Sequence, residues 1–215
     1  MELFWYGHSC FRLTERGLAT VVVDPFDSNI VGYFPIKIKA DIIAISHDAP
    51  SHNYIQAVKG ASHILNGPGE YEIGGVFITA VQTDGHGKKK SDQPRNTLYV
   101  FDYNGLTIAH LGDLMQVPTQ AEVEALGTVN VVLIPVGGGG GLNAAKAAEI
   151  VGLLEPNIII PMHYKTKDVK LPLDSLDKFI KEMGLQPSEV VPSLKISKSG
   201  LPTESKVIVM DYQRG

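Results

Sequence analysis

The same order of short features occurs twice in this 215-residue chain, and this repeat restricts the folds open to it. In the first half, a hairpin leads into LATVVVD, which ends at Asp24, and the apolar run DIIAIS begins 17 residues later at Asp41. In the second half, TLYVFDYNG leads into LTIAHLGD, which ends at Asp113, and NVVLIP begins 17 residues later at Asn130. The shared order of hairpin, strand, acidic residue, spacer and buried strand indicates an internal duplication. Two such halves are expected to pack sheet against sheet, with the helices outside.

The remaining pattern favours short strands over helices. Runs rich in Val, Ile, Phe and Tyr are bounded by turn residues. Asn104-Gly105 predicts a two-residue hairpin turn, because both positions tolerate a positive φ, and Glu15-Arg16-Gly17 is expected to turn an earlier hairpin. Segment 194–212 is expected to close a sheet as a last strand or hairpin. Four segments have helical apolar spacing, the last of them weakly: 118–126, 143–154, 172–184 and 53–59.

Length and composition suggest one domain, residues 1–215, that forms its core without cross-links. A chain of this length buries roughly 70% of its unfolded surface. The single cysteine, Cys10, excludes an intramolecular disulfide, fits a reducing compartment and is expected to be a small core residue. The N-terminal residues lack the pattern of a signal peptide, and the apolar runs are far shorter than the roughly 20 residues that cross a bilayer. We therefore expect a cytoplasmic protein with no membrane association.

The charge balance bears on possible partners. The chain has 19 basic and 23 acidic residues, for a net charge of −4, which disfavours a general nucleic-acid binder. A small-molecule substrate is expected instead, and homo-oligomerisation stays open. Lys88-Lys89-Lys90 is expected to be a solvated loop face, although it could attract an anionic substrate.

Histidine and carboxylate side chains follow the ends of the apolar runs. Four of them come directly after such a run: Asp24, His47, Asp113 and His163. His52 lies five residues beyond His47, and His86 lies in a segment rich in glycine and lysine. Imidazole and carboxylate groups are the natural ligands of zinc and similar divalent ions. Any single histidine here is more simply read as a hydrogen-bonded loop residue, and only the set as a whole favours a metal site.

Six motifs resemble, in this order, the metallo-β-lactamase fold and in particular its small UlaG-like Zn-dependent hydrolase branch. They are GHSCF (7–11), VVVDPFD (21–27), ISH (45–47), HLGDL (110–114), PVGG (135–138) and IIPMHYKT (159–166). The resemblance extends from Leu3 to about Asp211. It implies an α/β fold, the four-layer αββα sandwich with two internally repeated halves, and a metal site at one edge between the two sheets.

The central motif of that family, His-x-His-x-Asp-His, is incomplete in this chain. His47 takes the place of the first histidine and His52 that of the last, but Ala49 and Ser51 stand where the second histidine and the aspartate belong. Alanine has no donor atom, and a neutral hydroxyl is a poor zinc ligand. One ion is therefore expected rather than two, with Zn first and Mn or Fe as alternatives. The resemblance implies a metal-ligand set of His47, His52, His86, Asp113 and His163.

The resemblance implies a metal-dependent hydrolase, in which a water on the ion attacks an ester, lactone or phosphodiester-like bond. Asp113 and His163 are the expected catalytic residues, and these two with His52 are expected to hold the ion, assisted by His47 and His86. Because Ser51 replaces the aspartate of the family motif, weaker hydrolysis is expected. The alternative is a non-catalytic or ligand-binding relative that kept the fold and lost its metal site. A nucleic-acid-processing role ranks third.

Three further features each have a structural and a functional interpretation. His8 is expected to be a buried, hydrogen-bonded residue rather than a ligand. Asp24 either orients a site residue or caps a loop. The glycine run 137–141 precedes a helix, as phosphate-binding loops do, but it lacks their lysine and Ser/Thr. It is therefore expected to be a flexible loop at the rim of the site.

Overall fold

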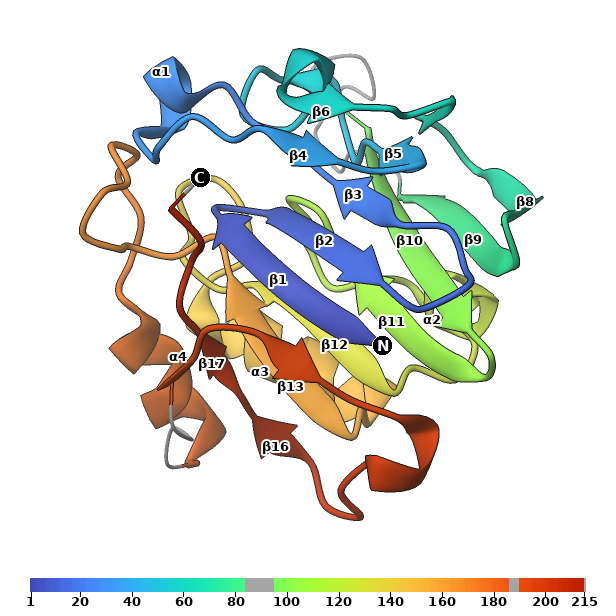
Figure 1. Ribbon diagram of the computed structural model, residues 1–215. Helices are drawn as coiled ribbons and strands as arrows, with labels where there is room; N and C mark the ends of the chain where they lie inside the picture. Colours follow the sequence, from blue (N-terminus) through green and yellow to red (C-terminus); the bar gives the residue numbers. More distant parts are fainter. Residues whose placement is uncertain (84–94, 186–189, 215) are drawn as a thin grey trace.

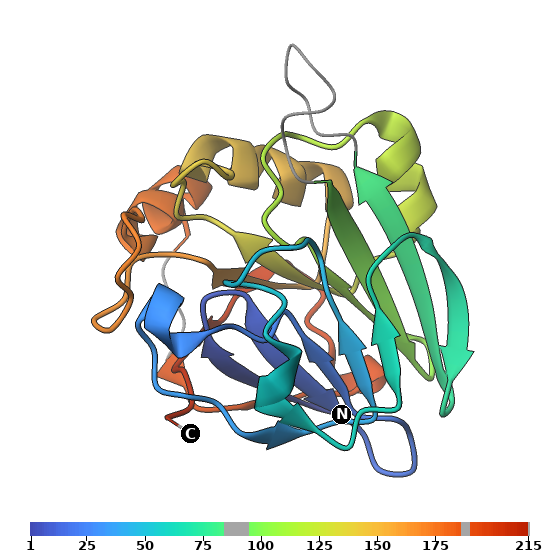
Figure 2. The same ribbon diagram turned by 90° about the horizontal axis from the view of Figure 1, so that it is seen from above.

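The computed structural model describes residues 1–83, 95–185 and 190–214, and it consists mainly of two β-sheets that face each other (Figures 1 and 2). The first sheet has the strand order β15-β1-β2-β3-β5-β7. Its strands are β1 (Glu2–Gly7), β2 (Cys10–Thr14), β3 (Val21–Val23), β5 (Ile42–Ala44), β7 (His63–Leu65) and β15 (Leu194–Lys195). The second sheet has the order β16-β13-β12-β11-β10-β9-β8. Its strands are β8 (Gly69–Ile73), β9 (Val76–Thr83), β10 (Asn96–Tyr103), β11 (Leu106–His110), β12 (Val131–Pro135), β13 (Ile158–Met162) and β16 (Lys206–Val207).

The predicted duplication is visible in the strand pairing. In the first sheet, β1, β2 and β3 are antiparallel, and β3, β5 and β7 then run parallel. In the second sheet, β9, β10 and β11 are antiparallel, and β11, β12 and β13 then run parallel. The carboxyl ends of the parallel strands therefore meet at one edge of each sheet. The α/β sandwich with two repeated halves is confirmed.

Two helices lie outside the second sheet: Figure 2 shows α2 (Gln120–Leu126) and α3 (Ala144–Leu154) covering its outer face. α3 begins where the sequence predicts, because the Asn143 side chain accepts a hydrogen bond from the Lys146 amide at 3.0 Å. α2 begins two residues after Pro118, behind a capping box formed by Thr119 and Glu122.

Two helix predictions are wrong in their extent. α4 (Leu176–Met183) begins at Leu176 rather than at residue 172, although it ends, as predicted, before a left-handed glycine at 184. The predicted helix at 53–59 is only a 3-10 turn, η1 (Ile55–Ala57), followed by β6 (Val58–Lys59). β6 pairs with β4 (Ile38–Lys39), so sheet pairing decides the local structure there. The first half otherwise contains one short helix, α1 (Ser28–Val31).

Two buried tyrosines of β10 tie the second sheet to loops of the first. The Tyr99 hydroxyl donates to the carbonyl oxygen of Ile45 at 3.0 Å, and it also lies 3.1 Å from that of Leu65. The Tyr103 hydroxyl donates to the carbonyl oxygen of Ala19 at 3.0 Å. Each such bond contributes roughly 1 kcal/mol. The bond to Ile45 also holds the chain next to Ser46 and His47 in place.

The C-terminal segment adds an edge strand to both sheets and is not a hairpin. β15 pairs with β1 in the first sheet, and β16 pairs with β13 in the second. The last strand, β17 (Val209–Met210), pairs with β14 (Val190–Val191). Cys10 is buried, as predicted for a core residue. Across the described ranges, no helix is both long and apolar enough to cross a bilayer.

Candidate metal centre

Four of the five predicted metal ligands lie together at the edge where the parallel strands end. His47 and His52 follow β5, Asp113 follows β11 and His163 follows β13. The Nε2 atom of His163 lies 3.5 Å from Oδ1 of Asp113, and the ring centres of His47 and His52 are 4.1 Å apart. The fifth, His86, lies outside the described residues.

The possible ligand atoms form two groups that share one residue. His8, His52 and His163 make up the buried group, and His47, His52 and Asp113 make up the open group. Within each group the ligand atoms all lie within 4.8 Å of one another. Residues of the buried group are at most 4% exposed, whereas the Asp113 side chain is 29% exposed. The trio predicted to hold the ion, His52, Asp113 and His163, is thus divided between the groups.

His8 enters this centre from the turn between β1 and β2. Its φ is +50° and that of His163 is +52°, a left-handed conformation that is uncommon outside glycine. The two are joined directly, because the His163 amide donates to the His8 carbonyl oxygen at 3.1 Å. Gly7, directly before His8, has a φ of +102°, and a Cβ there would lie 2.7 Å from the ring of Tyr33. Strained backbone of this kind persists only where the surrounding structure holds it.

Several polar atoms of the centre are buried without a hydrogen-bond partner among the described residues. They are Nδ1 and Nε2 of His8, Nδ1 of His163 and Oδ1 of Asp113. The expectation that His8 is buried is therefore right, and the expectation that it is hydrogen-bonded is wrong. Unpaired buried polar atoms cost roughly 1–3 kcal/mol each, so they point to a missing partner.

The buried rings are in the state that binds a cation. Desolvation, followed by the neighbouring histidines, holds the pKa of His8 and that of His52 well below the ordinary value of 6.5. Both rings are therefore neutral at pH 7, and neutral imidazole is the form that ligates metals. Ser51 Oγ lies 2.8 Å from His52 Nδ1, which leaves Nε2 of His52 to face Ser9 Oγ at 3.3 Å. These residues fit a divalent cation.

Asp24 supports His47 through Ser46. Its two carboxyl oxygens accept hydrogen bonds from the amide and the hydroxyl of Ser46, both at 2.7 Å, and Ser46 Oγ lies 3.0 Å from His47 Nδ1. Burial raises the pKa of Asp24 to about 8, against the lowering effect of the two Ser46 bonds. Asp24 thus holds the loop backbone and also reaches a candidate ligand, so both predicted roles fit its contacts.

Asp113 is held by Asn96, a residue that the sequence analysis did not single out. The Asp113 amide donates to Asn96 Oδ1 at 3.0 Å, and Asn96 Nδ2 donates to the Leu111 carbonyl oxygen at 3.0 Å. Between them, Gly112 has a φ of +60°, and a Cβ there would lie 2.3 Å from Asn96 Oδ1. No local sequence signal marks Asn96, because its role depends on a contact across two strands.

Two glycines of the run 137–141 are in close contact with the centre. A Cβ on Gly137 would lie 2.2 Å from the His163 carbonyl oxygen, and one on Gly141 would lie 2.6 Å from Asp113 Oδ1. The run is at the rim of the site, as predicted. Its glycines also allow the backbone to approach His163 and Asp113 where a side chain would not fit.

Comparison with known proteins identifies the family of this chain. The family profile described as the β-lactamase superfamily domain matches residues 2–163. A crystal structure from Thermotoga maritima, designated a Zn-dependent hydrolase of the metallo-β-lactamase superfamily, is 36% identical, with 99% of each chain covered and a TM-score of 0.81. This chain belongs to the metallo-β-lactamase superfamily. Its assignment to the UlaG-like branch remains a prediction.

Other members of the superfamily are more distant. A UPF0173 metal-dependent hydrolase of Thermoplasma acidophilum is 28% identical over 196 residues, covering 79% of this chain and 85% of that protein. A UPF0173 protein of Pyrococcus abyssi is 28% identical over 186 residues, covering 77% and 84%. The structure of Igni18, a metallo hydrolase of Ignicoccus hospitalis, is 20% identical with a TM-score of 0.67, covering 98% and 94%, and shows the shared fold.

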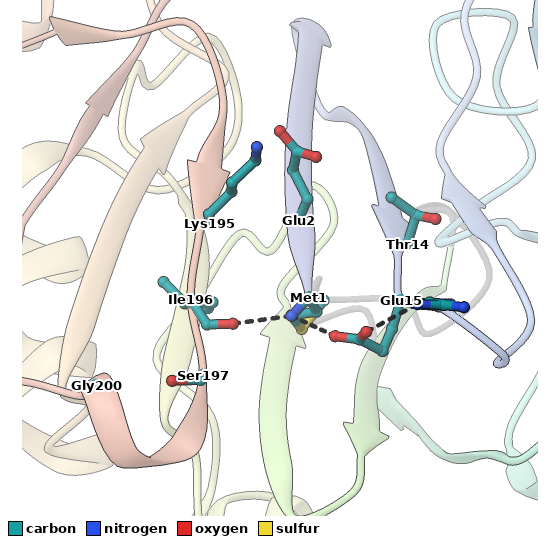
Figure 3. A pocket seen from close by; sticks show the side chains of 9 residues that line it. Met1, Glu2, Thr14, Glu15, Lys195, Ile196, Ser197 and Gly200 are labelled. Atoms are coloured by element: carbon teal, nitrogen blue, oxygen red, sulfur yellow. Dashed lines mark hydrogen bonds and ion pairs between the residues drawn. The ribbon is translucent and has the colours of Figure 1, made fainter.

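Two hollows of similar size lie at different places on this metallo-β-lactamase fold. One, of about 740 Å³, borders the centre; it is lined by Ile45, Ser46, His47, Asp48, Asn53, Ile55, Ile64, Asn66, Gln82, Arg95 and Thr97. The other, of about 710 Å³, lies at the start of β1, where the Met1 amine donates to the Ile196 carbonyl oxygen and pairs with Glu15 (Figure 3). Among the described residues, no histidine or cysteine lines the second hollow. Only the first is placed to deliver a substrate to the candidate ligands.

Proposed function

We propose that this protein is a metal-dependent hydrolase that holds one divalent ion, Zn or in its place Mn or Fe, in the histidine-rich centre. The observation that carries this proposal is the set of buried, unpartnered atoms on His8, Asp113 and His163. A cation bound among these residues would give a partner to one ring nitrogen of each histidine that ligates it. The names of the relatives from Thermotoga maritima and Thermoplasma acidophilum support the proposal, since both are described as metal-dependent or Zn-dependent hydrolases.

When bound, the ion would supply Lewis acidity, which makes water acidic enough to ionise near pH 7 and polarises the bond to be cleaved. The protein supplies position and proton transfer. Ser51 and Ser9 hold the ring of His52 between them. Asp113 is partly exposed and adjacent to His163, so its carboxylate can accept the proton that the attacking water loses. Asp113 and His163 are thus the proposed catalytic residues.

The substrate in this proposal is a small molecule with an ester, lactone or phosphodiester-like bond. The hollow beside His47 has about 740 Å³, within the range of roughly 300–1,000 Å³ that small-molecule sites occupy. Its lining includes the exposed guanidinium of Arg95, which favours a substrate with a negatively charged group.

The proposal is tested by metal analysis joined to an assay panel. The purified protein is loaded with Zn²⁺, Mn²⁺ or Fe²⁺, dialysed, and assayed on neutral and anionic aryl esters, lactones and an aryl phosphodiester. We expect about one equivalent of metal, and hydrolysis that a chelator abolishes and metal restores. Less than about a tenth of an equivalent after loading would instead establish the non-catalytic relative.

Arg95 offers a second test within the same panel. Arg95→Ala is expected to raise KM about tenfold for anionic substrates and to leave neutral ones unchanged. Arg16→Ala removes the same side chain from the lining of the other hollow and should leave both substrate types unchanged. Equal effects of Arg95→Ala on neutral and anionic substrates would rule out recognition of the negative charge.

A further inference from the structure

We propose that His8 is a metal ligand, and that the buried group of His8, His52 and His163 is the place where the ion binds. This inference rests on the proposed function and makes it more specific. It assigns a ligand that lies outside the incomplete motif of residues 47–52. The donor atoms missing at Ala49 and Ser51 are replaced by one that reaches the centre from the turn between β1 and β2.

The unpartnered state of His8 is the first step of the argument. His8 is 1% exposed, and neither of its ring nitrogens has a hydrogen-bond partner among the described residues. His110, which is also fully buried, differs from His8, because its Nε2 lies 2.8 Å from the Ser9 carbonyl oxygen and its Nδ1 accepts from the Gly112 amide at 3.1 Å. His110 is therefore satisfied as a structural residue, and His8 is not.

The surroundings of His8 define what its missing partner is. The centre of its ring lies 4.1 Å from that of His163 and 4.8 Å from that of His52. A neutral imidazole carries one N–H and one lone pair, and one ring nitrogen from each of the three histidines lies within 4.8 Å of the other two. A single water has only two protons to donate. A divalent cation accepts three lone pairs, and three nitrogen ligands with an open position are typical of catalytic zinc.

The spacing of the ligand atoms suits an ion after a small closure. The three nitrogens lie within 4.8 Å of one another. Tetrahedral zinc with bonds of about 2.0–2.1 Å places its nitrogen ligands roughly 3.4 Å apart. A closure of about an ångström or more therefore brings the rings to ligand distance, which rotation about the side-chain bonds supplies.

The backbone is built to hold His8 in this place. The His8 carbonyl oxygen accepts from Trp5 Nε1 at 3.0 Å and from the His163 amide at 3.1 Å. This second bond joins two ligands of the buried group directly, one from each half of the chain. Both residues hold left-handed conformations, and strained conformations of this kind concentrate at functional sites.

The test measures metal affinity and ligand number in three variants. Wild type, His8→Gly, His8→Asn and His63→Ala are titrated with Co²⁺ and Zn²⁺ against a competing chelator, and X-ray absorption counts the histidine ligands. Glycine and asparagine both tolerate the left-handed backbone at position 8. We expect both His8 variants to bind roughly 100-fold more weakly and to show one histidine ligand fewer. The exposed residue His63 is the matched control, and its variant should match wild type.

Chemical rescue provides a readout that misfolding would not give. His8→Gly leaves a space the size of an imidazole ring, so free imidazole at millimolar concentration should restore the Co²⁺ absorption spectrum in that variant alone. Unchanged affinity and ligand number in both His8 variants would overturn the assignment of His8 and leave the proposed function standing. A wild-type protein that binds neither metal would instead overturn the proposed function.

Discussion

The buried group and the open group share His52 but differ in the exposure and the charge of their other side chains. The buried group has three imidazoles that are at most 4% exposed, and those of His8 and His52 are neutral at pH 7. The open group includes the carboxylate of Asp113, which keeps 29% of its side chain in contact with solvent. Burying a neutral ring costs far less than burying an unpaired charge.

This difference explains how a site with an incomplete motif can keep its ligands. Positions 49 and 51 lie in the loop after β5 and offer no strong ligand. His8 comes from another turn of the same half and reaches the same ring of His52. The deeper position suits uncharged nitrogen ligands, and the exposed position suits a carboxylate that exchanges protons with a substrate or water.

Removal of the His52 ring, which both groups share, is expected to cause the largest loss of metal affinity. His52→Ala takes one ligand from both groups, so the affinity for Zn²⁺ should fall by roughly 100-fold or more. A chelator-competition titration measures this change. His63→Ala is the control, because His63 is exposed. Retention of full affinity in His52→Ala would show that neither group is the binding site.

The stability of the metal-free protein is expected to fall steeply as the pH falls below about 6.5. Burial lowers the pKa values of four histidines: those of His8 and His52 well below 6.5, that of His47 below 6.5, and that of His110 to about 4. The unfolded chain binds protons on these residues near pH 6.5, and the folded chain does not. Acid therefore favours unfolding.

The raised pKa of Asp24 has the opposite effect on the pH dependence of stability. Its pKa is raised to about 8 in the folded state, so between pH 4 and 8 the folded chain holds a proton that the unfolded chain releases. Between pH 4 and 6 the four histidines and Asp24 together give a net difference of at most about three protons, or roughly 4 kcal/mol per pH unit in the free energy of unfolding. Urea unfolding across this range measures the slope.

A variant of the buried group isolates the contribution of His8 to this slope. His8→Asn removes one of the four histidines and should reduce the slope by about one proton, which is roughly a third of its maximum. His63→Asn should leave the slope unchanged. A slope that does not respond to His8→Asn would contradict the burial of His8 as a neutral ring.

The hydrogen bond between Ser51 and His52 allows a more selective test. Ser51→Ala removes the hydroxyl that lies 2.8 Å from His52 Nδ1, and loss of such a supporting contact typically costs about tenfold in metal affinity. Ser62→Ala is a matched control, because Ser62 Oγ lies 2.9 Å from Nδ1 of the following residue, His63, on the surface. Equal affinities of the two variants would show that Ser51 does not orient His52.

The sequence predicted the features that depend on local pattern. The Asn104-Gly105 turn connects β10 and β11, and both residues have a positive φ, of 56° and 81°. The positions of His47, Asp113 and His163 at one edge could also be predicted, since the carboxyl ends of parallel strands meet there. The spacing of apolar residues is sufficient for these inferences.

The features that the sequence did not predict depend on distant contacts. The unpaired nitrogens of His8 follow from the packing of its ring against His163, which is far away in the chain. Asn96, on β10, acts through the amide of Asp113, which follows the neighbouring strand β11. The helix predicted at 53–59 does not form, because β6 pairs with β4 instead. The spacing of apolar residues within this segment does not reveal that pairing.

The smallest effect is expected from a change that acts on Asp113 alone. In Gly141→Ala the new Cβ would lie 2.6 Å from Asp113 Oδ1 and would displace that carboxylate. If the ion binds in the buried group, Zn²⁺ affinity should fall by less than about fivefold while hydrolysis falls more, because Asp113 then serves proton transfer.

Gly152→Ala is the control for this comparison, since a Cβ there meets no atom within 4 Å and the residue lies within α3. It should leave affinity unchanged and raise the free energy of unfolding by roughly 0.5–1 kcal/mol. A loss of metal affinity in Gly141→Ala as large as in His52→Ala would place the ion in the open group. The same titration therefore decides between the two groups, because only one of them contains the displaced carboxylate.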